Sequence, residues 1–123
     1  MEGSILDDVK KILGLSSDYN AFDLDIITHI NSVFSTLQQL GIGPEQGFSI
    51  SDKNNNWDEF VANDNGYNLV KTYMYLRVRL LFDPPATSFH LESLTQQLKE
   101  LEWRLNAYRE DSQWILHFPS HLL

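Results

Sequence analysis

Five leucines in the C-terminal part of the chain constrain the fold more than any other feature, because they are spaced alternately three and four residues apart. This is the a/d pattern of a helix that packs along one apolar seam. It predicts a helix from Thr87 or Ser88 to about Tyr108. Three heptads are short for a free coiled coil, so we expect an antiparallel partner within the same domain. The seam consists of Leu91, Leu94, Leu98, Leu101 and Leu105.

Three further segments carry apolar residues at helical spacing and end at residues that stop helices. A short helix is predicted over Ser4–Leu13, where Ser4 can cap the start and Gly14 supplies the stop. An amphipathic helix is predicted over Asp23–Leu40. A helix over Leu69–Phe82 is apolar around most of its circumference, and the prolines that follow it prevent its continuation.

These segments predict an all-α fold: a small helical bundle of about four helices with a long middle loop and an extended C-terminal tail. The periodic apolar positions of the three long helices should face one another and form the core. They are Ile26, Ile30, Val33, Phe34, Leu37, Val70, Tyr73, Leu76, Leu80, Leu94, Leu98, Leu101 and Leu105.

The middle loop, Gly41–Gly66, is rich in Gly, Asn, Asp, Ser and Pro, which is typical of turns. Within it, Phe48-Ser49-Ile50 could form a short strand and Trp57–Val61 one or two helical turns. Its four large apolar residues are too many for a solvated loop. We therefore expect the loop to face a neighbouring subunit or partner, the alternative being that it packs on its own domain.

The last eleven residues, Gln113–Leu123, are also unusually apolar for a chain end. We expect an extended tail that docks on a neighbouring copy or on an adjoining component of an assembly, the alternative being that it folds back on its own domain. The chain is accordingly divided into a helical domain, residues 1–111, and a tail, residues 112–123. The expected partner interface consists of Phe48, Ile50, Trp57, Phe60, Trp114, Ile115, Leu116 and Phe118.

The charge balance argues against ordinary nucleic-acid binding. The 123 residues include 9 Lys or Arg and 17 Asp or Glu, a formal charge of −8, with no basic run longer than Lys10-Lys11. The aromatic residues of the helices are therefore interpreted as core and interface residues rather than as a platform for stacking bases. Such acidity can still serve a DNA mimic, or a passage to which DNA must not adhere.

Composition excludes several other classes. Without cysteine, the chain has no disulfide, no thiol nucleophile and no cysteine metal site. No window approaches about 18 uninterrupted apolar residues, so we expect no membrane span. The first eight residues carry acidic groups and no basic cluster, so we expect no secretory signal there.

No catalytic, cofactor or metal site is expected. The segment from Asp52 to Asp58 imitates the start of an EF-hand, but Trp57 stands where Gly is required and Asn63 where a bidentate Glu is required. An asparagine-rich turn that caps the Trp57 helix explains the same residues. Asp25 and His29 form an i, i+4 pair, which is interpreted as a surface pair because no nucleophile or phosphate-loop motif accompanies it.

Several strings, taken in order over about Ile5 to Asn106, resemble the head–tail connector (adaptor) family of tailed bacteriophages and prophages of Gram-positive bacteria. They are His29-Ile-Asn-Ser-Val-Phe34, Gln39-Leu-Gly-Ile-Gly-Pro44, Gly47-Phe-Ser-Ile50, Trp57-Asp-Glu-Phe60, Val70-Lys-Thr-Tyr-Met-Tyr-Leu-Arg-Val-Arg-Leu-Leu-Phe-Asp-Pro-Pro85 and Glu100-Leu-Glu-Trp-Arg-Leu-Asn106.

The resemblance implies an all-helical virion structural protein without catalytic residues, located at the virion neck and, during assembly, in the host cytoplasm. It implies a ring below the portal, expected to hold twelve copies, through which DNA passes without specific binding. The implied partners are other copies, the portal protein, and a stopper or tail-completion protein. The alternatives are an acidic helical partner-binding protein and a DNA-mimic inhibitor, although interleaved acids and bases disfavour a mimic.

Overall fold

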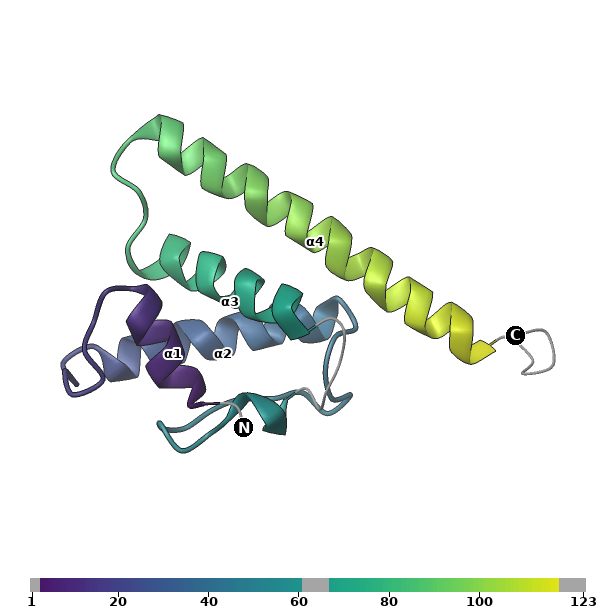
Figure 1. Ribbon diagram of the computed structural model, residues 1–123, viewed down its shortest axis with the longest axis horizontal. Coiled ribbons are helices and arrows are strands. Elements are labelled where there is room, and N and C mark those ends of the chain that lie inside the picture. Colours follow the sequence, from purple (N-terminus) through teal and green to yellow (C-terminus); the bar gives the residue numbers. More distant parts are fainter. Residues whose placement is uncertain (1–2, 61–66, 118–123) are drawn as a thin grey trace.

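Four α-helices and one 3-10 turn make up the regular structure of the described part of the chain, residues 3–60 and 67–117, in the computed structural model (Figure 1). Side chains are described as far as Arg109. The helices are α1 (Ile5–Ile12), α2 (Asp23–Gln39), α3 (Tyr67–Phe82) and α4 (Ser88–His117), and the turn η1 spans Trp57–Glu59. The predicted all-α bundle is confirmed.

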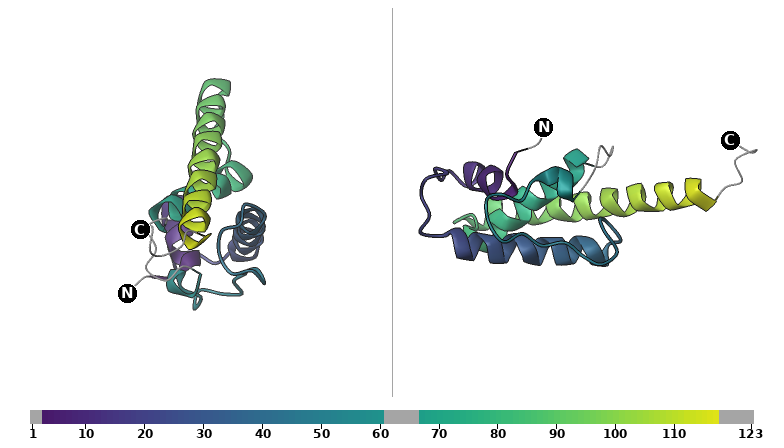
Figure 2. Two further views of the ribbon diagram at one scale, coloured as in Figure 1. Left: turned by 90° about the vertical axis from the view of Figure 1, so that its right-hand side faces the viewer. Right: turned by 90° about the horizontal axis from the view of Figure 1, so that it is seen from below.

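The helices α2, α3 and α4 run alternately up and down, with α3 between the other two (Figures 1 and 2). The short α1 contacts both α2 and α3. The predicted antiparallel partner of the leucine seam is therefore α3. The end of α4 projects past the rest of the bundle in Figure 1.

The core contains eleven of the thirteen predicted residues, while Leu76 and Leu80 are half-buried at its edge. Nine further residues join it, from α1, from α3 and from the middle loop. Their inclusion shows that α1 and the loop complete the core that the three long helices leave open. The additional core residues are Ile5, Leu6, Val9, Ile42, Ile50, Trp57, Phe60, Met74 and Val78.

The predicted ends of α1 are confirmed in detail. The Ser4 hydroxyl accepts a hydrogen bond from the Asp7 backbone N–H at 3.2 Å, which satisfies a donor in the first turn. Gly14, with φ of 82°, takes the left-handed conformation that ends the helix. The left-handed Gly43 in the middle loop has a second constraint, since a Cβ there would collide with the Phe60 ring.

The predicted end of the fourth helix near Tyr108 is wrong, because α4 continues to His117. Residues 113–117 are therefore helical instead of extended. The physical reason is that no helix-breaking residue stands between Tyr108 and His117, and Pro119 is the first to follow. The predicted boundary between domain and tail at residues 111 and 112 falls inside this helix. Residues 118–123 lie outside the described part.

The possible strand Phe48-Ser49-Ile50 is not formed. The only β pairing in the described residues is an isolated bridge between Ser4 and Asn56. The predicted turns at Trp57 are reduced to η1. The loop nevertheless has a defined path, because the Ile5 N–H donates to the Asn55 carbonyl at 3.1 Å and links it to the start of α1.

Candidate interaction surfaces

The middle loop places its large apolar side chains inside the chain's own core. Ile50, Trp57 and Phe60 are buried, and Phe48 packs half-buried against them. Phe34 of α2 is the centre of this cluster, since its ring centroid lies 4.9 Å from that of Phe48 and 4.7 Å from that of Phe60. The loop thus covers one side of α2, which supports the alternative that it packs on its own domain.

Polar contacts with α1, α2 and α3 hold the loop in place. The Asn31 side chain on α2 bonds both backbone groups of Ile50, donating to its carbonyl at 3.0 Å and accepting from its N–H at 2.8 Å. The Trp57 indole N–H donates to the Asp8 carboxylate of α1 at 2.8 Å. The Lys71 ammonium lies 5.5 Å from the Trp57 ring centroid and 3.8 Å from the same carboxylate. The loop therefore connects α1, α2 and α3.

The asparagine-rich turn before η1 is confirmed as a capping structure. The Asn56 N–H donates to Glu59 at 2.6 Å as part of a capping box, and Asn55 accepts from the Ser51 N–H at 2.9 Å. The Asp52 carboxylate accepts from the Asn54 N–H at 2.8 Å. These oxygens satisfy backbone donors of the turn. In the described residues, no group of three His, Asp or Glu side chains is arranged to hold a metal ion.

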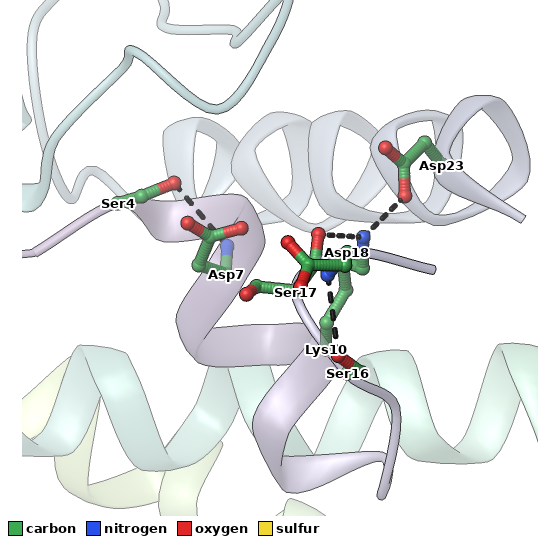
Figure 3. A network of polar contacts seen from close by, with 7 residues as sticks. All are labelled: Ser4, Asp7, Lys10, Ser16, Ser17, Asp18 and Asp23. Atoms are coloured by element: carbon green, nitrogen blue, oxygen red, sulfur yellow. Dashed lines mark hydrogen bonds and ion pairs between the residues drawn. The ribbon is translucent and has the colours of Figure 1, made fainter. Parts of the chain in front are cut away.

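An ion pair between a buried lysine and a partly exposed aspartate fixes the connection between α1 and α2. Lys10 is only 1% exposed, and its ammonium lies 2.8 Å from Asp23 and donates to the Ser17 carbonyl at 3.1 Å (Figure 3). Burying a charge is costly unless it is paired and hydrogen-bonded. Figure 3 shows that the lysine reaches from α1 across the loop toward the start of α2. The pair is structural, because it joins elements of the same chain.

Helix α4 has two faces of different character. Its seam residues Leu94, Leu98, Leu101 and Leu105 are buried against the bundle. The Tyr73 hydroxyl of α3 donates to the Glu102 carboxylate at 2.7 Å beside this seam. Burial, and secondly this hydrogen bond, raise the pKa of Tyr73 above its usual value near 10.

The opposite face of α4, called here the outer face, exposes Phe89 by 73% and Trp103 by 71%. These residues are 14 positions apart, about four helical turns, so they share one side of the helix. Glu92, Gln96 and Glu100 lie between them and are also exposed. The two rings lie about 21 Å apart along the axis with polar residues between them, so they are two separate exposed aromatics and not one apolar patch.

A second exposed aromatic surface, called here the end patch, lies where α2 begins and α3 ends. The ring of Phe22 is 5.8 Å from Tyr19 and 5.5 Å from Phe82, edge to face in both cases. Leu81, which precedes Phe82 in α3, is also exposed. His29 packs its ring 6.4 Å from Phe82. The Asp25–His29 pair singled out in the sequence therefore borders an aromatic patch.

The charges of the chain are unevenly distributed. Residues 1–66 hold 11 acidic and 3 basic residues, whereas residues 67–123 hold 6 of each. The whole formal charge of −8 thus belongs to the half that contains α1, α2 and the loop. All four arginines belong to the other half, on α3 and α4. The molecule therefore carries an electrostatic asymmetry between its two halves.

The residues expected at a partner interface fall into two groups. The four loop residues, Phe48, Ile50, Trp57 and Phe60, lie together around α2 and contribute to the core. The backbone of Trp114, Ile115 and Leu116 is helical, but their side chains, and Phe118 altogether, lie outside what the structure describes. The outer face was not predicted from the sequence. The signal that could have indicated it is a pair of aromatic residues about four turns apart, on the side of the helix opposite the leucine seam.

Comparison with known proteins identifies one family. A sequence model described as phage connector protein matches residues 5–112. No curated protein and no solved structure matches the chain. Within the described residues, none of the helices is both long enough and apolar enough to cross a membrane.

Proposed function

The chain belongs to the phage connector protein family, and on that premise we propose that it is a head–tail connector, or adaptor, of the virion. It forms a ring of twelve copies below the portal, at the virion neck, and DNA passes through the ring without specific binding. Its partners are other copies of itself, the portal protein, and a stopper or tail-completion protein. It assembles in the host cytoplasm and has no catalytic role, as is general for this structural family.

The observation that carries this proposal is the family match over residues 5–112. The match includes α1, α2 and α3 completely and α4 as far as its last turns. It therefore covers the whole bundle and both exposed aromatic surfaces.

The charge distribution supports a passage for DNA. A ring that presents acidic residues to its channel repels phosphates and lets DNA slide, whereas a basic lining would release counterions and hold it. The acidic half of this chain, residues 1–66, offers such a lining. The outer face and the end patch offer surfaces for the contacts between subunits or between stacked rings.

Removal of the gene from the phage or prophage that encodes the chain tests the proposal. We expect filled or leaking heads separate from free tails in electron micrographs of the lysate, and recovery of joined particles when the chain is supplied in trans. Mass spectrometry of purified wild-type particles should detect the chain, and electron microscopy should place a ring at the portal vertex.

Two results would contradict the proposal. One is a deletion lysate with intact, tailed and infectious particles. The other is the absence of the chain from purified wild-type particles, which would favour an acidic partner-binding protein or a DNA-mimic inhibitor that acts in the infected cell.

A further inference from the structure

Helix α1 and the middle loop lie far apart in the sequence but are bonded directly to each other. The Ile5 N–H donates to the Asn55 carbonyl at 3.1 Å, and Ser4 and Asn56 form an isolated antiparallel bridge. These contacts join the first turn of α1 to the turn that precedes η1. Neither part can move away alone without breaking backbone bonds of the other part, and unpaired backbone groups are costly unless water replaces the partner.

A side-chain contact extends this junction into the core. The Trp57 side chain is fully buried, and its indole N–H donates to the Asp8 carboxylate of α1 at 2.8 Å. Ile5 and Val9 on α1 are also fully buried and belong to the same core cluster as Trp57. Withdrawal of α1 alone would remove the hydrogen-bond partner of the indole and open the cluster that encloses it. The burial of Trp57 and the docking of α1 therefore depend on each other.

Neither part is stable by itself. Helix α1 has eight residues, and isolated helices shorter than about 12 residues are marginal in water. Apart from the bridge, the loop from Phe48 to Phe60 contains no regular structure beyond the three residues of η1. In contrast, α2, α3 and α4 have 17, 16 and 30 residues, and α3 packs on both of the others. Partial opening of the chain should therefore begin with α1 and the loop.

The segment that joins α1 to α2 is suited to act as a hinge. Eight of its ten residues, 13–22, are exposed, and none of the ten belongs to the buried core. The ion pair between Lys10 and Asp23, at 2.8 Å, holds this hinge closed. Because the Asp23 side chain is already partly exposed, and Lys10 gains water when α1 lifts, opening leaves neither charge buried without a partner.

We propose that α1 and residues 48–60, together called the clasp, open and close as one cooperative unit while α2, α3 and α4 stay packed. The contacts within the clasp remain formed during this opening, and the contacts that break are those between the clasp and the three long helices. The clasp is a property of the single chain and does not depend on ring formation.

The closed clasp conceals an aromatic face of α2 and α3. Phe34 of α2 is only 1% exposed, and its ring centroid lies 4.7 Å from that of Phe60 and 6.5 Å from that of Trp57. The Tyr75 ring of α3 lies 6.2 Å from the Trp57 ring, edge to face. Opening of the clasp removes these covering rings together and exposes the face to water. The clasp is thus a lid over an apolar surface that belongs to the chain's own core.

Amide hydrogen exchange of the purified full chain, resolved by NMR, tests this unit. Val9 reports on α1, Leu101 reports on the packing of α4, and Phe60, whose N–H donates to the Trp57 carbonyl at 2.9 Å, reports on the loop. We expect the protection factors of Val9 and Phe60 to agree within about threefold, and that of Leu101 to be about tenfold higher or more. A larger difference between Val9 and Phe60, or a smaller one from Leu101, would overturn the proposal.

Substitutions in one part of the clasp should be felt in the other part. Leu6 on α1 is 2% exposed, and Leu6→Ala should lower the protection of Phe60 by the same factor as that of Val9, about tenfold or more, with Leu101 unchanged. Phe48→Ala in the half-buried part of the loop should lower the protection of Val9 and Phe60 equally, which gives a second and milder variant. An effect confined to the substituted part would overturn the proposal.

A matched control uses an apolar residue on the outward side of the same short helix. Ile12 is 49% exposed, so Ile12→Ala should leave the protection of Phe60 within about threefold of wild type. A loss at Phe60 as large as that from Leu6→Ala would overturn the coupling through the buried side of α1. An equal loss at Leu101 in either clasp variant would also overturn the proposal, because it would mean that the whole chain opens at once.

Discussion

The middle loop and helix α4 both carry large aromatic side chains, but the loop buries its aromatics whereas α4 exposes two of them. Trp57 in the loop is fully buried, and Trp103 on α4 is 71% exposed. The loop is rich in turn-forming residues but carries four large apolar ones, and α4 has a leucine seam on one side and exposed aromatics on the other. The position of an aromatic residue, and not the composition of its segment, therefore decides whether it is buried.

This difference shows that the number of apolar residues in a segment does not tell whether their side chains are buried or exposed. The loop residues pack against α2, because Phe34 contacts the Phe48 ring and the Asn31 amide bonds the Ile50 backbone on the loop-facing side of that helix. On α4, the leucine seam has already used the side that faces α3. Aromatic residues on the opposite side of α4 therefore remain exposed to solvent, however hydrophobic they are.

Trp57→Ala should have the largest effect on the isolated protein, a loss of about 3–5 kcal/mol in the free energy of unfolding. The substitution removes a buried ring and the indole N–H bond to Asp8. Urea melts followed by circular dichroism measure the loss. Trp103→Ala is the matched control, and it should change stability by less than about 0.5 kcal/mol. Equal losses in the two variants would contradict the buried and exposed assignments.

Leu98→Ala should lower the free energy of unfolding by about 2–5 kcal/mol, since Leu98 is buried at the centre of the seam. This variant tests the inward side of α4 as Trp103→Ala tests its outward side. The more exposed Leu91, at the start of the seam, serves as the control, and Leu91→Ala should cost clearly less. A loss below about 1 kcal/mol for Leu98→Ala would place that residue outside the core.

Asn31→Ala should cost about 1–3 kcal/mol, because it removes two hydrogen bonds and leaves the backbone groups of Ile50 without that partner. The helix content measured by circular dichroism should persist, while hydrogen exchange of the Ile50 amide accelerates. Ser32→Ala, at the exposed neighbouring position, should leave both readings unchanged. Unchanged exchange at Ile50 in the Asn31 variant would mean that the loop is held by its aromatics alone.

Tyr73→Phe should have the smallest effect at neutral pH, about 1 kcal/mol, from loss of the bond to Glu102. Because folding raises the pKa of Tyr73, the unfolded chain releases this proton first as the pH rises past about 10. The stabilisation is therefore complete below that pH and declines above it. Urea melts between pH 8 and 11 should show a steeper decline in wild type than in the variant. Parallel declines would contradict the raised pKa.

The helices and most of the core could be predicted from the sequence, because apolar residues at helical spacing mark the buried side of a helix. The three long helices begin within two residues of their predicted starts, and α2 and α3 also end where expected. The end of α4 was placed too early, near Tyr108, because the apolar seam stops at Leu105. A helix ends where the backbone can no longer continue, and the first residue to impose that is Pro119.

The interaction surfaces were harder to predict because they depend on what the rest of the chain leaves uncovered. The Tyr19–Phe22–Phe82 contacts join residues that are up to 63 positions apart, so no local pattern announces them. Trp103 was recognised only as an aromatic of the core or an interface. Its assignment to the outside follows once the opposite side of α4 is known to face α3.

Lys10 and Lys11 are adjacent in the sequence, but only one of them meets solvent. The Lys10 ammonium is enclosed by Asp23 and the Ser17 carbonyl, whereas Lys11 is exposed. An amine-reactive reagent should therefore acylate Lys11 rapidly and reach Lys10 only when the segment between α1 and α2 opens. The rate at which Lys11 is acylated therefore measures the reactivity of the reagent. The rate at which Lys10 is acylated, relative to Lys11, measures how often the segment opens. Peptide mapping of reacted subunits and reacted particles would show whether assembly slows that opening.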